Sequence, residues 1–113
     1  MAKVAILVPY PEMCDIARPL LEDCTEHLEV QCLEYIETPK AAQRARELEG
    51  QGCELIIARG TQAAQIKQAV RIPVVEMCVT TQELGMVMMK LKTLLGEERP
   101  VIGLIGFSNM LCD

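Results

Sequence analysis

Apolar and polar positions change their spacing along the chain, alternating between patterns typical of strands and patterns typical of helices. Short apolar runs of strand length occupy residues 3–8, 28–36, 53–58, 73–77 and 101–105. The second run alternates apolar and polar residues, which predicts a half-buried strand. The third run is continuously apolar, as a strand buried in a parallel sheet is.

Between these runs, apolar residues recur every three or four positions and predict four helices. The predicted helices span residues 11–27, 38–50, 61–70 and 81–95. Thr38 is expected to cap the second helix, and Thr80 with Glu83 forms a capping-box pattern before the fourth. Gly96 is expected to end that fourth helix.

Strands and helices therefore alternate from one end of the chain to the other. This order predicts a parallel sheet with right-handed crossovers and helices on both faces. We expect an α/β fold: a doubly wound, Rossmann-like or flavodoxin-like domain of three layers. Its sheet should have about five strands in the order 2-1-3-4-5.

Composition narrows the possible functions. The 113 residues carry a formal net charge of −5, and no cluster of Lys and Arg with aromatic neighbours is present. Direct contact with nucleic acid is therefore not expected, because such contact needs cations gathered on one face. The apolar run near Met1 is too short for a signal peptide or a membrane span, so we expect a cytoplasmic protein that does not contact a membrane.

Six cysteines and one histidine are present, without a C-x-x-C pair or zinc-finger spacing. We expect no metal and no cofactor, and cysteines that stay reduced. An alternative function is catalysis by cysteine thiols. Cys78 ends a predicted strand near a helix start, which favours the thiolate, and Cys14 follows the first predicted strand closely. With Arg59 binding a carboxylate, the chain would be a cysteine-dependent, cofactor-free racemase or isomerase.

The loops after the strands are the expected place for chemistry, because ligands of doubly wound folds bind at the carboxyl ends of the strands. Arg59, Gly60 and Thr61 follow the third predicted strand and open a helix. A fixed positive charge, a close backbone approach, a hydroxyl group and a helix N-terminus together favour a carboxylate or phosphate. The alternative is structural: Thr61 caps its helix while Arg59 pairs with Glu12 or Glu76.

Other familiar sites are excluded by missing motifs. The chain has neither a G-x-G-x-x-G turn after its first strand nor a G-x-x-x-x-G-K-[ST] loop. A phosphoacceptor receiver domain would need acidic residues where this chain has Pro9 and Arg59. Met86, Met88 and Met89 cannot all lie on one side of a helix, so they predict core packing with some exposed or interface positions.

Four stretches, "ILVPYPEM", "ELIIARGTQAAQIKQAV", "IPVVEMCVTTQEL" and "VIGLIGFSNM", together resemble the N-terminal sensor domain of the propionate catabolism activator family. Such domains precede AAA+ modules in sigma-54-dependent transcription regulators. The resemblance implies a two-lobed module without catalytic activity that binds a small anionic metabolite, such as the tricarboxylate 2-methylcitrate, between its lobes. After "IPVVE" the family has an aromatic and acidic turn, whereas this chain has Thr80-Thr81-Gln82-Glu83.

Carried over to this sequence, the resemblance implies a set of ligand-binding residues and a domain plan. Glu76 is expected to orient Arg59 or the adjoining loop. Residues 1–100 would form the first lobe, and residues 101–113 a crossing strand and the start of a truncated second lobe, so we expect a fragment of a longer protein. An attached AAA+ ATPase is the expected partner, along with homodimerisation by strand or tail exchange. The implied ligand-binding residues are Tyr10, Arg59, Gly60, Thr61, Thr80 and Asn109.

Overall fold

The computed structural model describes residues 2–23, 28–99 and 101–105. The chain forms two compact units, Met1–Met77 and Cys78–Asp113, which are described here one after the other. Asn109 and His27 lie outside the described residues.

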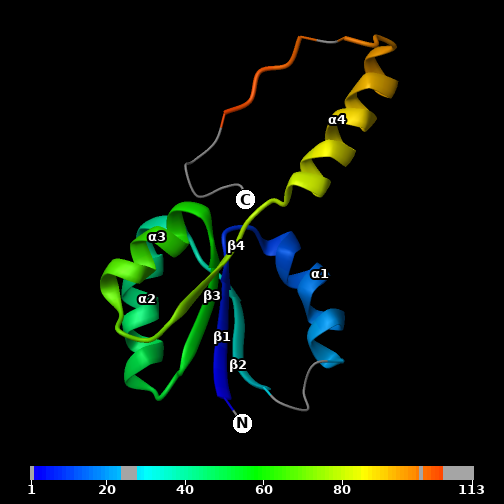
Figure 1. The fold of residues 1–113 in the computed structure, drawn as a ribbon. Coiled ribbons are helices and arrows are strands. Elements are labelled where there is room, and N and C mark those ends of the chain that lie inside the picture. Colours follow the sequence, from blue (N-terminus) through cyan, green and yellow to red (C-terminus); the bar gives the residue numbers. More distant parts are fainter. Residues whose placement is uncertain (1, 24–27, 100, 106–113) are drawn as a thin grey trace. The chain divides into compact units, whose positions relative to one another are not determined.

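The first unit contains a four-stranded parallel sheet with the strand order β2-β1-β3-β4 (Figure 1). This order confirms the predicted α/β fold and the first four positions of the predicted strand order. The elements of this unit are β1 (Ala2–Val8), α1 (Pro11–Glu22), β2 (Leu28–Tyr35), α2 (Thr38–Gly50), β3 (Leu55–Arg59), α3 (Gly60–Ala69) and β4 (Val74–Met77).

The predicted fifth strand is not formed. Residues 101–105 have no strand structure, and Val101 and Ile105 are almost fully exposed. A strand exists through its backbone pairing with a neighbour. The described part of the second unit contains α4 (Thr81–Leu95) and no strand with which these residues could pair.

Helices cover both faces of the sheet, as the doubly wound prediction requires. Helices α2 and α3 lie on one face and α1 on the other (Figure 1). The core between the sheet, α2 and α3 is built from aliphatic and small side chains, which lets the helix backbones approach the strands closely. Its fully or almost fully buried members are Ala5, Leu7, Ala41, Ala45, Leu48, Cys53, Ile56, Ala58, Ala63 and Ile66.

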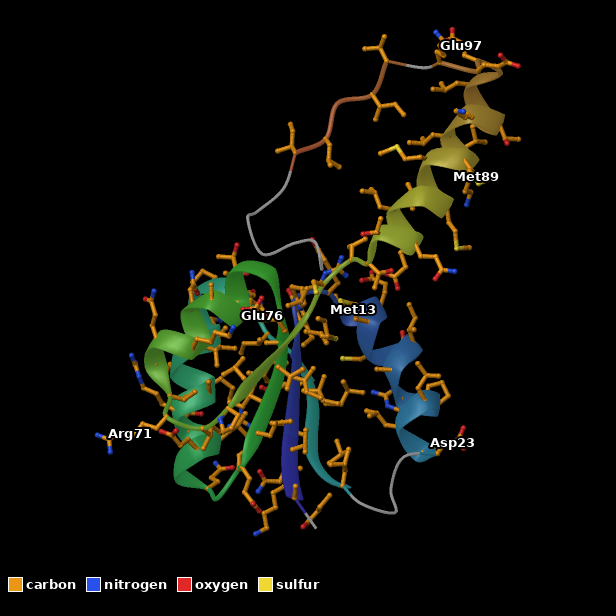
Figure 2. All side chains as sticks on the ribbon, viewed as in Figure 1. Met13, Asp23, Arg71, Glu76, Met89 and Glu97 are labelled. Carbon is orange, nitrogen blue, oxygen red and sulfur yellow. The ribbon has the colours of Figure 1, made fainter. Side chains whose placement is uncertain are left out.

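A second core lies under α1. Val4, Ile6 and Val8 of β1 are buried there with Cys14, and Met13 packs against them (Figure 2). Helix α1 opens with Pro11 in its first turn, as predicted, but ends at Glu22. Leu20 of this helix is 65% exposed.

Strand β2 departs from the strict alternation that its sequence predicts. The pairing with β1 shifts between Val4 and Ala5, so that Val4 pairs with Val30 and Ala5 with Cys32. This irregularity moves the side chains that follow it to the other face. Cys32 therefore packs on the α2 side, and Leu33 reaches the core under α1.

Polar contacts fix α2 near its middle and at its C-terminal end. Arg44 donates to Glu34 of β2 at 2.9 Å and to Glu47 at 3.2 Å. The side chain of Glu49 accepts from the backbone N–H groups of Arg71 at 2.6 Å and Ile72 at 3.1 Å. The carboxylate of Glu49 thus ties the end of α2 to the turn between α3 and β4.

In the second unit, α4 begins and ends as its sequence predicts. Thr80 accepts from the Glu83 N–H, and the Glu83 carboxylate accepts from the Thr80 N–H, which completes the capping box. Gly96 ends the helix with φ 68°, a left-handed conformation that favours glycine. Met86 and Met89 are exposed on α4. Within the described residues, every helix is too short or too polar to cross a membrane.

Candidate functional site

The carboxyl ends of four parallel strands meet at one edge of the sheet in the first unit. Strand β3 reaches this edge at Arg59, and α3 starts at the next residue, Gly60, with no intervening loop. A cation and a helix N-terminus are therefore adjacent at the edge where ligands of this fold class bind.

The side chain of Arg59 leaves the sheet on the side of α1. The residue is extended, with φ −127° and ψ 142°, so it follows the strand alternation. Ile57 packs in the core under α1, and Arg59 therefore shares its face. The residue is half-buried.

The Arg59 guanidinium has no carboxylate partner and no hydrogen bond among the described residues. The alternative pairing with Glu76 is wrong, because Glu76 binds Lys67 of α3. Glu76 pairs in register with Ala58, and Ala58 packs on the α2 and α3 side. Glu76 therefore lies on the face opposite Arg59, which also contradicts the expectation that it orients Arg59. The pairing with Glu12 is not formed either.

Gly60 and Thr61 form the first turn of α3. Gly60 has φ 56°, a conformation that other residues adopt at a cost of about 1–2 kcal/mol. Thr61 was the expected cap in the structural alternative, and this is wrong: the N-cap residue is Arg59, and its side chain makes no capping hydrogen bond. Since the helix starts one residue earlier than predicted, the Thr61 side chain is already inside the first turn.

Tyr10 lies at the same edge of the sheet. It is the N-cap residue of α1, and its side chain is 60% exposed. Ile6 pairs with Ile57 in the parallel register, and two further residues along each strand bring Val8 beside Arg59. The loop that carries Tyr10 therefore lies next to the Arg59 and Gly60 junction, on the side of α1.

The remaining predicted ligand residues are not brought together with these. Thr80 belongs to the second unit, where its hydroxyl accepts the capping bond from Glu83. Asn109 is outside the described residues. Two surface hollows lie elsewhere: one of about 300 Å³ is lined by α2 and α3 residues such as Arg46 and Gln65, and one of about 490 Å³ adjoins Gly96.

The cysteines differ from the sequence expectation at one position. Cys14, Cys32 and Cys53 are free thiols, whereas Cys78 is disulfide-bonded. The expectation that all cysteines stay reduced is therefore wrong for Cys78. A disulfide sulfur is not a thiolate nucleophile, so this state does not favour the racemase alternative.

Cys32 is the only thiol among the described residues with a resolved change in acidity. Burial raises its pKa, and the negative charge of Glu34 raises it further. A raised pKa keeps the thiol neutral and unreactive. No group of three or more His, Cys, Asp or Glu side chains in the described part of the chain is placed to hold a metal ion.

Gln62 is a residue of this edge that the sequence interpretation missed. Its side chain is 2% exposed, and its Nε2 donates to the Ile36 carbonyl at 2.8 Å and to the Thr38 hydroxyl at 3.3 Å. Thr38 was expected to cap α2, but the N-cap is Glu37 and the Thr38 hydroxyl accepts from Gln62 instead. The available signal was its spacing: Gln62 precedes Ile66 by four positions and so shares the buried stripe of α3.

These features define a class: a doubly wound α/β domain with a half-buried, unpaired cation at the carboxyl edge of its sheet. A family model described as propionate catabolism activator matches residues 26–113, a range that includes Arg59, Gly60 and Thr61 but not Tyr10. The chain belongs to this family, which is one of regulatory domains, and membership agrees with a role other than catalysis. Neither the curated proteins nor the solved structures contain a significant match.

Proposed function

We propose that this chain is the effector-sensing domain of a sigma-54-dependent transcription activator and that it binds a small carboxylate, such as 2-methylcitrate, at Arg59. The observation that carries the proposal is that Arg59 is half-buried and its guanidinium has no carboxylate partner in the described part of the chain. Partial burial removes water from a cation, and a bound anion would compensate for that loss. The family supports a regulatory role.

The first turn of α3 supports the same ligand chemistry. A helix N-terminus carries a partial positive charge, and its first N–H groups have no partner within the helix. Since the N-cap residue Arg59 makes no side-chain capping hydrogen bond, we expect a ligand oxygen to accept from N–H groups of this turn. Arg59 would bind one carboxylate, and the Gly60 and Thr61 segment would contact the same or a second carboxylate.

The rest of the proposed site extends beyond this edge. Tyr10 would contact the ligand from the loop after β1, and Thr80 and Asn109 are the further ligand-binding residues of this proposal. Effector binding would then favour one of two arrangements of the domain, and an attached AAA+ ATPase would respond to that arrangement. A homodimer formed by exchange of a strand or tail is part of the same proposal.

Substitution of Arg59 by alanine should abolish stabilisation by carboxylates. A ligand that binds only the native state adds about 2.7 kcal/mol of stability at a concentration one hundred times its Kd. The melting temperature should be measured with citrate, 2-methylcitrate, succinate and inorganic phosphate. The native chain should show a rise with at least one carboxylate.

Arg71→Ala is the matched control, since Arg71 is an exposed arginine of the same unit, on the turn after α3 (Figure 2). This variant should keep the full rise in melting temperature, whereas Arg59→Ala should lose it. An equal loss in both variants would indicate a general effect of positive charge. No rise with any of the four anions in the native chain would overturn the proposal.

A further inference from the structure

Gln62 is the only buried polar side chain in the described part of the chain, and it is not fully satisfied. Its Nε2 has two acceptors, whereas its Oε1 is buried without a hydrogen-bond partner. Rotation of the amide by half a turn would place Oε1 against the Ile36 carbonyl oxygen, so the contacts define the orientation. A buried amide with one unpaired atom is costly, and its position calls for a reason beyond packing.

The contacts of Gln62 link the end of β1, the segment after β2 and the first turn of α3. The Ile36 N–H donates to the Val8 carbonyl, the last of β1, at 3.0 Å. The Ile36 carbonyl, one residue beyond the end of β2, accepts from Gln62. Gln62 itself lies in the first turn of α3, three residues after Arg59. A continuous path of hydrogen bonds thus runs from β1 through the segment after β2 to the start of α3.

This path attaches the first turn of α3 to the neighbouring strands. The N-cap residue Arg59 makes no side-chain capping hydrogen bond, so its own side chain does not fix this turn. The described hydrogen bonds from side chains of the first turn of α3 to other elements come from Gln62 alone. Arg59 is held in the sheet by its pairing with β4, and the Gln62 amide adds the side-chain hydrogen bonds that join the first turn of α3 to the segment after β2.

We propose that Gln62 is the positioning residue of the anion site. It holds the first turn of α3 at a fixed separation from the ends of β1 and β2, so that Arg59 and the helix N-terminus face one ligand together. This inference rests on the proposed function. Because coupling between two sites is reciprocal, an anion at Arg59 also stabilises the hydrogen bonds of Ile36.

The test compares Gln62→Met with Gln65→Met. Both changes place methionine for glutamine on α3, but the Gln65 side chain is exposed and makes no hydrogen bond in the described part of the chain. The Kd of citrate, succinate and inorganic phosphate is measured by calorimetry at a temperature where denaturation curves show each variant folded. Gln62→Met should weaken the best of these ligands about 10-fold, as loss of a supporting residue does at other ion sites, and Gln65→Met should not. A loss of packing alone would lower stability and leave the Kd of the folded protein unchanged.

Hydrogen exchange of the Ile36 amide gives a second measurement that does not depend on a variant folding. In the unsubstituted chain, the best-binding anion should slow this exchange about 5-fold or more. Unchanged exchange with the anion bound, or equal Kd values in the two variants, would overturn the positioning role and leave the proposed function standing. Absence of binding by the unsubstituted chain would overturn the proposed function and this inference with it.

Discussion

Replacement of Leu48 by alanine is expected to lower the free energy of unfolding by about 3–4 kcal/mol, because it removes a large buried side chain from a core that cannot collapse to fill the space. Leu48 lies on α2, is 2% exposed and is among the largest fully buried side chains. Its neighbours in this core include Ile56 of β3 and Ile66 of α3. The cavity would therefore open between α2 and the part of the sheet that leads to Arg59.

Urea denaturation followed by circular dichroism measures this loss. Leu20→Ala is the matched control, since Leu20 is an exposed leucine on α1. Its effect should stay within about 0.5 kcal/mol, as expected for surface positions. Similar losses for the two variants would contradict the described packing of α2 against the sheet.

Gln62→Glu is expected to destabilise the protein by about 3–5 kcal/mol near neutral pH, as other uncompensated buried charges do. The substitution keeps the shape of the side chain but removes the Nε2 donor. It would place a carboxylate oxygen against the Ile36 carbonyl and the Thr38 hydroxyl, of which only the hydroxyl can donate. Burial and the carbonyl oxygen both oppose ionisation.

The pH dependence of this variant has a defined sign. Its new carboxyl group would have a pKa above the unfolded value of about 4.3, because the folded state disfavours the charged form. Below about pH 4.3 the carboxyl is protonated in both states and can donate one hydrogen bond to Ile36, so most of the stability returns. As the pH rises toward the folded pKa, that stability is lost.

Gln65→Glu, an exposed position of α3, controls for the added negative charge. Unfolding free energies of the two variants should converge at acidic pH and separate toward neutral pH. Parallel curves would show that the Gln62 side chain is not held in the buried position described here.

Much of the fold follows from the sequence because strands and helices alternate with few exceptions. The continuous apolar run before Arg59 predicts a buried parallel strand, and β3 is one. The run at residues 101–105 has a similar composition but forms no strand. Pairing with a neighbour decides whether such a run becomes a strand, and local composition does not contain that information.

The candidate site was predicted in part. Arg59 directly follows an apolar run, and this predicts its position at the carboxyl edge of the sheet. The absence of an ion pair between Arg59 and Glu76 depends on which face of the sheet each residue occupies. A one-residue difference in the start of α3 makes Arg59 the N-cap and turns Thr61 from a cap into part of the first turn. Gln62 was missed because a polar residue on a helix is usually exposed. The disulfide of Cys78 depends on which residues the fold brings together, which spacing along the chain does not reveal.

The most direct test of the proposed anion site is to determine where an anion binds on the folded chain. An isotope-labelled sample should be titrated with citrate while the backbone amide signals are followed by NMR. We predict the largest shifts at Gly60, Thr61 and Gln62, with smaller shifts near Tyr10. Largest shifts at Arg46 and Gln65, or at Gly96, would place the ligand in one of the other surface hollows and contradict the account.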